Sequence, residues 1–299
     1  MKQASLSFSS LLIFLFLPLS SQAATPQAPT HKVQGKRLAA QSPPLSVVGN
    51  KLKTRTGETV RLQGVNIPSL EWSDTGDSQL MQSVDTALSV WHANVIRLPL
   101  SQDRWFGMVD KQLDDGAAYR KVVDNVVQAV SAKHAYVIID LHWSNGGAWG
   151  KDIGQHNMPD LNSIFFWKDA AAHFANNPAV LFDLYNEPHD VSWDIWKSGG
   201  MVTESDKKRG TEKTYRTPGL QKLLDTVRAT GAKNIVVAGG LDWAYDLSGV
   251  MNGYALDDPG VNAVMYATLH IGQVTCIGQE ASRASDCEEM DLNGTDRVP

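Results

Sequence analysis

The sequence predicts an α/β protein of the (β/α)8-barrel type, and three observations support this. Continuous apolar runs alternate with helical patterns along the chain, which indicates βα units and a parallel sheet covered on both faces. No glycine-rich phosphate-binding motif follows the first run, which argues against an open nucleotide-binding sheet. Polar and aromatic residues occur where the runs end, and in a barrel these ends converge on one face.

The composition limits the classes of protein to consider. The chain has 299 residues, 42% of them hydrophobic, and a formal net charge of −5. This is sufficient for one sizeable core, and there is neither a basic face nor a long acidic tail. We therefore expect no nucleic-acid partner. The two cysteines, Cys276 and Cys287, could pair in an oxidising compartment, but they cannot hold the fold together.

Residues 1–24 are expected to be a signal peptide. A lysine at position 2 precedes an apolar run at 11–19 and small residues near Ala24, as is typical of a cleaved secretory signal. The run is too short to span the roughly 30 Å of a bilayer, so a membrane anchor is the weaker interpretation. The protein is expected to be secreted or periplasmic, without membrane association after cleavage. Residues 25–45 are expected to be a flexible leader.

The elements of the domain can be assigned in order. A β-hairpin is expected around Thr56-Gly57, where two alternating segments meet. The six expected strands are residues 61–67, 93–100, 136–143, 180–188, 234–240 and 262–270. The helical patterns between them are residues 78–93, 117–134, 163–177 and 217–233. The domain that they form is expected to extend over residues 46–271.

Seven of the nine tryptophans follow the ends of expected strands. They are Trp72, Trp105, Trp143, Trp149, Trp193, Trp196 and Trp243. Indole rings that line a cleft suit a ligand with flat apolar faces and polar edges, such as a pyranose ring. For any single tryptophan, packing within a loop is an equal alternative, so the prediction depends on the set.

The motif Asn186-Glu187-Pro188 is the main catalytic candidate. A glycosidic oxygen is a poor leaving group, and a carboxylic acid of raised pKa can deliver the proton that it needs. Glu187 ends an apolar strand, where desolvation is expected to favour its protonated form. Pro188 is expected to hold the backbone of Glu187 extended. A capped strand end with a solvated glutamate would give the same short pattern.

Taken together, the strand ends resemble glycoside hydrolase family 5, the cellulase-like group of clan A glycosidases. The matching residues are GVN (64–66), NVIRLP with Arg97, IDLHW with His142, NEP with Glu187, GGLDW with Trp243, and the strand ending at His270. The resemblance extends from about residue 46 to residue 271. Each motif alone is weak, but their joint order and spacing are specific.

The resemblance implies a retaining double displacement. Glu187 would be the acid of the first step and the base of the second, and Asn186 would bind the sugar 2-hydroxyl. Arg97 would hold the nucleophilic carboxylate, although a structural ion pair is an alternative for it. His142 and His270 would line the subsite at the cleavage point. Trp243 would form a wall of the cleft, and Trp143 is a weaker candidate for the same role.

A metal centre is an alternative interpretation of the histidines. Asp140, His142, His270 and His189 could be imagined around zinc, but the D-x-H spacing within a strand lacks the pattern of known zinc sites. Asp140 is expected to lie deeper in the barrel as a paired buried carboxylate. No G-x-S-x-G elbow of a serine hydrolase is present. We expect no metal and no other cofactor.

The nucleophile cannot be assigned. Retaining chemistry requires a second carboxylate about 5 Å from the first, and the resemblance implies a glutamate at the end of a seventh strand. Only residues 271–299 remain, so the barrel is expected to hold about six of eight βα units, with residues 272–299 as an irregular tail. Three explanations stay open: a truncation or frameshift, a divergent end with Glu280, Glu288 or Glu289 as nucleophile, or a sugar-binding protein without hydrolytic activity.

The sequence thus predicts a secreted glycosidase that cleaves β-1,4-glucan in the manner of an endoglucanase. A mannanase or another β-glycanase of the same family is the first alternative. A catalytically inactive carbohydrate-binding remnant is the second. In each case the expected partner is a polysaccharide or oligosaccharide.

Overall fold

The computed structural model describes residues 42–206, 210–261, 263–270 and 273–278. The expected signal peptide and most of the expected leader lie outside these residues. For residues 42–45, the prediction of a flexible leader is wrong. Ser42 is buried and donates its hydroxyl to the carbonyl of Ala135 (2.7 Å), and the Tyr136 hydroxyl donates to the carbonyl of Pro43 (2.9 Å). These two bonds fix the segment to the beginning of a strand.

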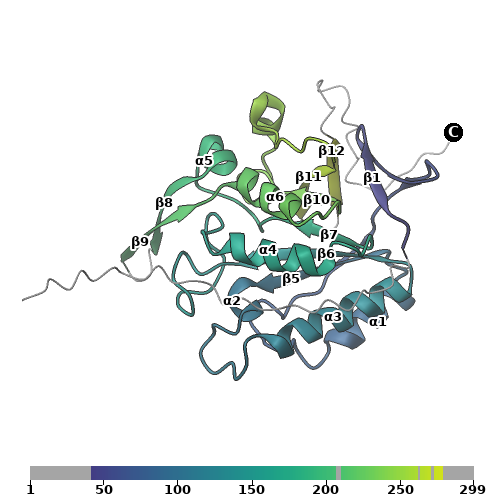
Figure 1. Ribbon diagram of the computed structural model, residues 1–299, viewed down its shortest axis with the longest axis horizontal. Helices are drawn as coiled ribbons and strands as arrows, with labels where there is room; N and C mark the ends of the chain where they lie inside the picture. Colours follow the sequence, from purple (N-terminus) through teal and green to yellow (C-terminus); the bar gives the residue numbers. More distant parts are fainter. Residues whose placement is uncertain (1–41, 207–209, 262, 271–272, 279–299) are drawn as a thin grey trace, which may run out of the picture.

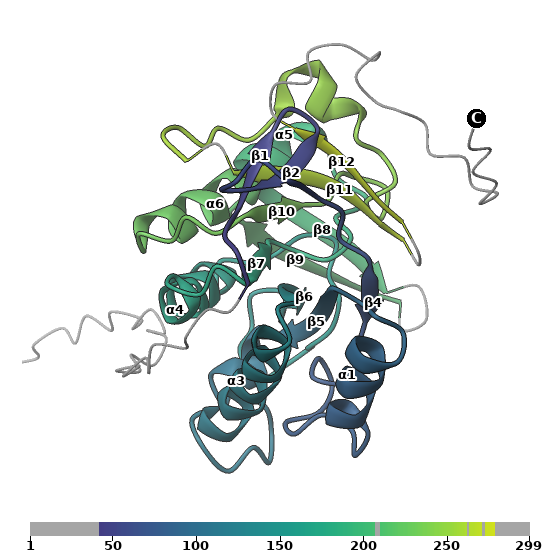
Figure 2. The same cartoon turned by 90° about the vertical axis from the view of Figure 1, so that its right-hand side faces the viewer.

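Six parallel strands form the central sheet, and they confirm the six expected strands (Figures 1 and 2). They are β4 (Gly64–Asn66), β5 (Val95–Ser101), β6 (Tyr136–Trp143), β7 (Val180–Asp183), β10 (Val236–Ala238) and β11 (Val264–His270), which pair in this order. All four residues of β7 are buried. Burial on both faces explains why the strands read as continuous apolar runs.

Helices cover the outer face of this sheet (Figure 1). The four expected helices are present as α1 (Leu80–Ser89), α3 (Ala117–Ala132), α4 (Ser163–Phe174) and α6 (Leu220–Ala229). In α3 the buried residues include Val123, Val126, Val127 and Val130, which follow helical spacing. The short helices α2 (Gln102–Trp105) and α5 (Trp193–Ser198) and the π-helix η1 (Val250–Tyr254) were not predicted.

A seventh strand, β12 (Gln273–Gly278), pairs antiparallel with β11. The prediction of an irregular tail at residues 272–299 is therefore wrong for these six residues. Antiparallel strands can be joined by a short turn, and β12 forms its backbone hydrogen bonds with the free edge of β11. Such pairing does not require a long apolar run, so no signal in the sequence marked this strand. In the described part of the chain, β4 and β12 are the two edges of an open sheet.

A small antiparallel sheet closes the amino-terminal end of the sheet interior. Its strands are β1 (Leu45–Val48), β2 (Lys51–Thr54) and β3 (Thr59–Val60), and β2 and β3 are the hairpin expected around Thr56-Gly57. Leu52 of β2 belongs to a buried cluster with residues that begin the central strands, such as Val95 and Tyr136. In Figures 1 and 2 this small sheet lies beside β11 and β12, and β2 contacts β12.

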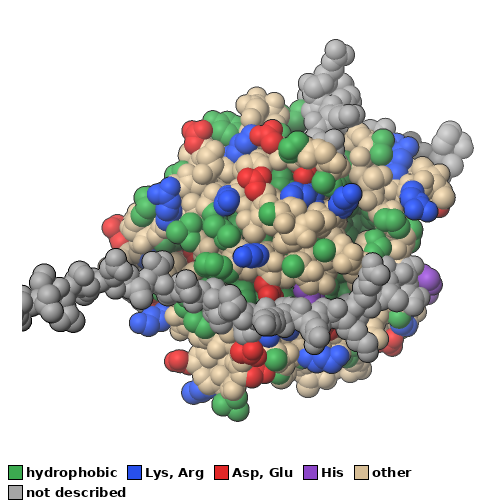
Figure 3. All heavy atoms as spheres, in the orientation of Figure 1, with side chains coloured by type: hydrophobic (Ala, Val, Ile, Leu, Met, Phe, Trp, Pro, Cys, Tyr) green, Lys and Arg blue, Asp and Glu red, His purple; other side chains and the backbone are tan. Residues whose placement is uncertain are grey.

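A second hairpin, β8 (Gly200–Asp206) and β9 (Thr211–Thr217), extends from the side of the molecule (Figure 1). It has no counterpart among the predicted elements. On the face shown in Figure 3, acidic and basic side chains are interspersed rather than gathered by sign. Within the described ranges, no helix has the length and apolarity needed to cross a membrane.

The contribution of Leu52, which packs beneath the first residues of the central strands, can be tested with one substitution. Leu52→Ala is expected to lower the free energy of unfolding by about 2–4 kcal/mol, because it opens a cavity beneath the strands. Val48→Ala in the neighbouring strand is the control, since Val48 is 50% exposed and its truncation should cost below about 1 kcal/mol. Urea unfolding followed by tryptophan fluorescence measures both values. Equal effects would show that the small sheet does not seal the interior.

Candidate active site

Arg97 is the centre of a polar cluster at the level where β4 and β7 end, with Asn66 and Asp183 as the last residues of these two strands. Its guanidinium lies 2.9 Å from Asp140 Oδ2 and 2.8 Å from Asp183 Oδ2, and it donates to Asn186 Oδ1 (3.0 Å) and Asn66 Oδ1 (3.2 Å). Asp140 and Asp183 are register partners on β6 and β7. The arrangement is a structural ion pair, the alternative that the sequence left open for Arg97. Asp140 is the paired buried carboxylate that was predicted.

The charges in this cluster do not balance, because one guanidinium faces two fully buried carboxylates. Burial raises the pKa of Asp183 to about 7, with Arg97 opposing the rise and Asp140 adding to it. Burial lowers the pKa of Arg97, but Asp140 and Asp183 outweigh it, so the pKa of Arg97 is raised. The cluster can therefore hold an extra proton on the Asp183 carboxyl near neutral pH.

His142 is fixed by Asp140. Its Nδ1 lies 2.5 Å from Oδ2 of the buried Asp140, and this contact sets the orientation of the ring. The rest of the side chain is partly exposed. Glu71, which the sequence analysis missed, is a neighbour. It is buried and accepts a hydrogen bond from the Ser69 backbone N–H (2.8 Å). Burial raises the pKa of Glu71, whereas hydrogen bonds from the backbone of Glu71 and Ser69 and the nearby His142 lower it. The net change in the pKa is upward.

Glu187 lies at the same end of the sheet as Arg97. The strand pairing continues past β7, since Asn186 donates its N–H to the carbonyl of Leu141 (3.0 Å). Glu187 is half-buried, and its Oε2 accepts a hydrogen bond from Gln155 Nε2 (3.0 Å). The prediction of an extended backbone at Glu187 is wrong: its φ is +48°. Such a left-handed residue is strained, and it turns the chain sharply after the strand.

Trp243 lies in an unusual loop next to the residues that follow Glu187, and its backbone N–H donates to the carbonyl of Pro188 (3.2 Å). Asp242, Trp243 and Ala244 have φ values of +54°, +56° and +67°, three successive left-handed residues. The loop can turn this tightly because Gly240 has no side chain, and a Cβ there would lie 1.8 Å from the carbonyl of Asp246. Trp243 remains 41% exposed and stacks on His189 with 4.6 Å between ring centroids.

The prediction that seven tryptophans line one cleft is wrong for part of the set. Trp105 and Trp196 are completely buried and donate their indole N–H groups to Asp169 and to the Gly239 carbonyl. They lie on the short helices α2 and α5, which pack into the core. Exposed indole is found at Trp72, whose ring lies 6.3 Å from that of Trp143, and at Trp243. Two groups of aromatic rings thus follow the ends of the parallel strands: Trp72 with Trp143, and Trp243 with His189.

His270 is the last residue of β11, as expected, but its side chain lies outside the described part of the structure. The same holds for Glu280, Glu288 and Glu289. Cys287 is also outside the described ranges, so the pairing of the cysteines stays a prediction. Among the described residues, no three acidic, histidine or cysteine side chains form a group that could hold a metal ion.

Comparison with known proteins identifies the lineage. The sequence profile described as Cellulase (glycosyl hydrolase family 5) matches residues 54–290. The chain belongs to glycosyl hydrolase family 5. The match extends past residue 271, where the sequence analysis ended the domain. The family and its solved structures identify the six parallel strands as part of a (β/α)8 barrel that is incomplete in the described residues.

Two curated relatives are distant in sequence. Endoglucanase Z of Dickeya dadantii is 26% identical over 208 residues, which cover 68% of this chain and 40% of the relative. Endoglucanase 1 of Saitozyma flava is 28% identical over 207 residues, covering 68% and 51%. The chain thus spans about half the length, or less, of these curated relatives.

Solved structures agree on the fold. The β-glucanase SdGluc5_26A from Saccharophagus degradans superimposes with a TM-score of 0.57 at 21% identity, covering 81% of this chain and 66% of the other. A second structure of that enzyme, in complex with cellotetraose, gives a TM-score of 0.56 at 21% identity, covering 84% and 67%. At this identity the likeness shows the fold alone.

The unbalanced charge beside Arg97 predicts a pH-dependent stability. A carboxyl whose pKa is raised on folding contributes stability below its unfolded pKa and loses that contribution as pH rises through its folded value, here about 7. Asp183→Asn should remove this loss, so that the variant loses less stability than the wild type between pH 5 and pH 8, by on the order of 2 kcal/mol.

Urea unfolding at the two pH values measures this difference. Burial also raises the pKa of Asp103, to about 6. Asp103 therefore adds a loss of stability with rising pH of the same sign, and both proteins retain it. Asp225→Asn, at an exposed position of α6, is the control. An unchanged slope in Asp183→Asn would show that the Asp183 carboxyl stays ionised throughout this range.

Proposed function

We propose that the chain is a secreted retaining glycoside hydrolase that cleaves β-1,4-glucan in the manner of an endoglucanase. The observation that carries the proposal is the placement of Glu187, half-buried, at the carboxyl ends of the parallel strands with Arg97, Asn186 and His142 at the same end. Catalytic groups of barrel enzymes occupy this face. The endoglucanase relatives and the cellotetraose bound by a family 5 neighbour support a β-linked glucan as substrate.

Glu187 would act as the acid and base. In the first step its carboxyl would protonate the glycosidic oxygen while a nucleophilic carboxylate, not assigned among the described residues, attacks the anomeric carbon and the leaving sugar departs. In the second step the Glu187 carboxylate would deprotonate the water that displaces this nucleophile from the anomeric carbon. Asn186 supports binding of a hydroxyl beside the reacting carbon. Because Arg97 only donates hydrogen bonds, the oxygen of the Asn186 amide must face it, which leaves Nδ2 as a buried donor with no partner among the described residues, so a small shift of the side chain would be needed for a hydroxyl to reach it.

The aromatic residues at the strand ends would suit a sugar chain. Trp72 with Trp143, and Trp243 with His189, would offer it aromatic faces. Such faces can stack on the apolar faces of pyranose rings while polar groups bind the ring edges. His142 and His270 would line the cleavage subsite. Specificity for glucan over mannan depends on hydroxyl contacts at this site, so a mannanase is the alternative within the family.

A sugar-binding protein without hydrolytic activity is the second candidate. One observation favours it: Arg97, expected to hold a nucleophilic carboxylate, is instead occupied by Asp140 and Asp183, which are fully buried beneath the cleft. Such a protein would retain the walls and the polar floor of the cleft but would lack the second reacting carboxylate.

One substitution separates the two candidates. Glu187→Gln should lower kcat on soluble β-1,4-glucan by at least about 100-fold, because a general acid contributes on the order of 10²–10⁴. Binding of cello-oligosaccharides should persist. Glu212→Gln, an exposed change of the same chemistry, is the control. Negligible rates in both the wild type and Glu187→Gln, with binding retained, would favour the binding protein, and faster hydrolysis of mannan would favour a mannanase.

A further inference from the structure

We propose that residues 155–157 form a bridge through which the β8–β9 hairpin sets the orientation of Glu187. In this arrangement Gln155 is a positioning residue, and Glu204 of the hairpin is its anchor. The inference rests on the proposed function insofar as Glu187 is the acid, but the bridge itself is a set of contacts that can be tested without any activity. No motif in the sequence indicated it.

The first contact of the bridge is with the acid itself. Gln155 Nε2 lies 3.0 Å from Glu187 Oε2, and an amide nitrogen can only donate. Oε2 is therefore the acceptor, and because a carbonyl oxygen accepts better than a hydroxyl oxygen, the contact favours the acidic proton on Oε1. Gln155 thus selects which oxygen of Glu187 faces the leaving group. A general acid depends on this geometry as well as on its pKa.

The second contact is with the segment that follows the acid. The carbonyl of Asn157 accepts the His189 backbone N–H (3.1 Å), and His189 Nδ1 donates to the carbonyl of Glu187 (2.7 Å). His189 also stacks on Trp243. The same three residues therefore hold the acid side chain, the strained backbone after it and, indirectly, the aromatic wall of the cleft.

The segment between β7 and Glu187 also holds the bridge. The Tyr185 hydroxyl accepts the backbone N–H of His156 (3.1 Å) and donates to the carbonyl of the same residue (2.9 Å). Tyr185 is fully buried and lies two residues before Glu187. The backbone of the bridge is thereby fixed on the side of this segment.

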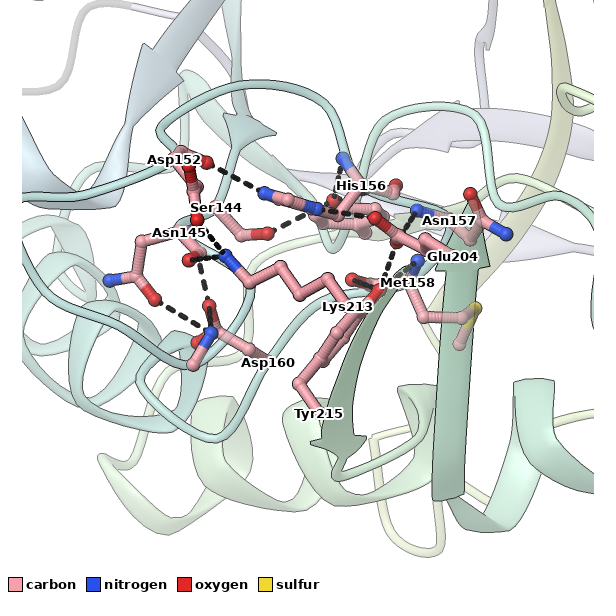
Figure 4. A network of polar contacts seen from close by, with 12 residues as sticks. Ser144, Asn145, Asp152, His156, Asn157, Met158, Asp160, Glu204, Lys213 and Tyr215 are labelled. Carbon is pink, nitrogen blue, oxygen red and sulfur yellow. Dashed lines mark hydrogen bonds and ion pairs between the residues drawn. The ribbon is translucent and has the colours of Figure 1, made fainter. Parts of the chain in front are cut away.

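The hairpin holds the bridge from the opposite side, as Figure 4 shows. Glu204 Oε1 accepts the Asn157 N–H (2.6 Å) and the Tyr215 hydroxyl (2.7 Å), and Oε2 lies 2.7 Å from His156 Nδ1. Lys213 adds a second attachment through Asp152 Oδ2 (2.9 Å). An isolated two-stranded hairpin is marginally stable in water, so its position depends on these polar contacts together with the packing of Val202 and Tyr215 in the main core.

His156 is a cation in this arrangement. Its Nε2 lies 2.8 Å from the carbonyl of Asp152 and its Nδ1 faces Glu204, so both ring nitrogens must carry hydrogen. Burial lowers the pKa of His156, but Glu204 outweighs it and the pKa is raised. Burial raises the pKa of Glu204, but His156, Tyr215 and Asn157 outweigh it and the pKa is lowered.

The ion pair between His156 and Glu204 therefore stabilises the bridge only within a limited pH range. The groups that face His156 are Glu204, Lys213 and Tyr215 of the hairpin, Asp152 of its own loop and Tyr185 of the segment after β7. The stabilisation is lost as pH rises through the raised pKa of His156, and as pH falls through the lowered pKa of Glu204. Between these limits the hairpin is docked.

Hydrogen exchange tests the bridge directly. Glu204→Ala is expected to reduce the protection of the Asn157 and His189 amides at least about tenfold, because both bonds depend on the anchored segment. Glu212→Ala removes a carboxylate from the exposed face of the same hairpin and should change neither amide. Mass spectrometry of peptides that cover residues 155–158 and 187–190 measures both. Unchanged protection at His189 in Glu204→Ala would overturn the proposal.

If Glu204→Ala does not fold, a second variant, Glu204→Gln, still tests the bridge. Glu204→Gln keeps the size of the side chain and one acceptor oxygen but removes the charge that His156 faces. It should weaken protection at His189 in the same direction, by about threefold or more. Far-ultraviolet circular dichroism confirms that the variant is folded, and a folded Glu204→Gln with wild-type protection at His189 would also overturn the bridge.

Leaving-group dependence tests the positioning of the acid. Gln155→Ala should lower kcat/KM about tenfold on phenyl cellobioside, whose leaving group needs a proton, and less than about threefold on dinitrophenyl cellobioside, which does not. Equal losses on both substrates would contradict a positioning role. Absence of hydrolysis by the wild type on either substrate would contradict the proposed function, while the exchange result would still decide whether the bridge exists.

Discussion

The guanidinium of Arg97 is the interaction on which the site depends. It lies between two fully buried carboxylates and two asparagine oxygens, and so it joins β4, β5, β6 and the end of β7. A buried carboxylate without a partner is strongly destabilising, so separating the strands here would cost the free energy of leaving Asp140 and Asp183 without Arg97. Glu187 follows directly after one of these ligands, Asn186. The position of Glu187, the proposed acid, therefore depends on a structural ion pair, and loss of activity in an Arg97 variant would not by itself reveal a catalytic role.

The sequence predicted those elements whose signal is local. Six strands and four helices were identified because burial on both sheet faces gives continuous apolar runs and helix packing gives a 3.6-residue period. The β8–β9 hairpin was missed because polar bonds from Glu204, Lys213 and Tyr215 to a distant loop contribute to its docking. Strand β12 was missed because antiparallel pairing requires only a neighbouring edge. Long-range polar partners leave no periodic trace in a sequence.

The site shows the same division. Arg97, His142, Asn186, Glu187 and Trp243 were named from the motifs at strand ends, and the parallel sheet brings those ends to one face. What the sequence could not give is conformation: the left-handed backbone of Glu187, the burial of Trp105 and Trp196, and the approach of Gln155. Each of these depends on which residues of other segments fill the neighbouring space.

The position of β12 bears on the choice between hydrolase and binding protein. In a barrel, a carboxylate that completes the pair with Glu187 would come from the strand beside β11, and in the described residues β12 takes that edge. Its sequence, QVTCIG, contains no carboxylate, and it runs antiparallel, so its carboxyl end points away from the face that carries Glu187. The residues proposed to deliver the proton, Glu187 with Arg97 and Asn186, lie on β5 or in the segment after β7, and both strands have neighbours on each side. Proton delivery and sugar binding, as proposed, would therefore not depend on the edge where a nucleophile is expected, which is why binding and hydrolysis have to be measured separately.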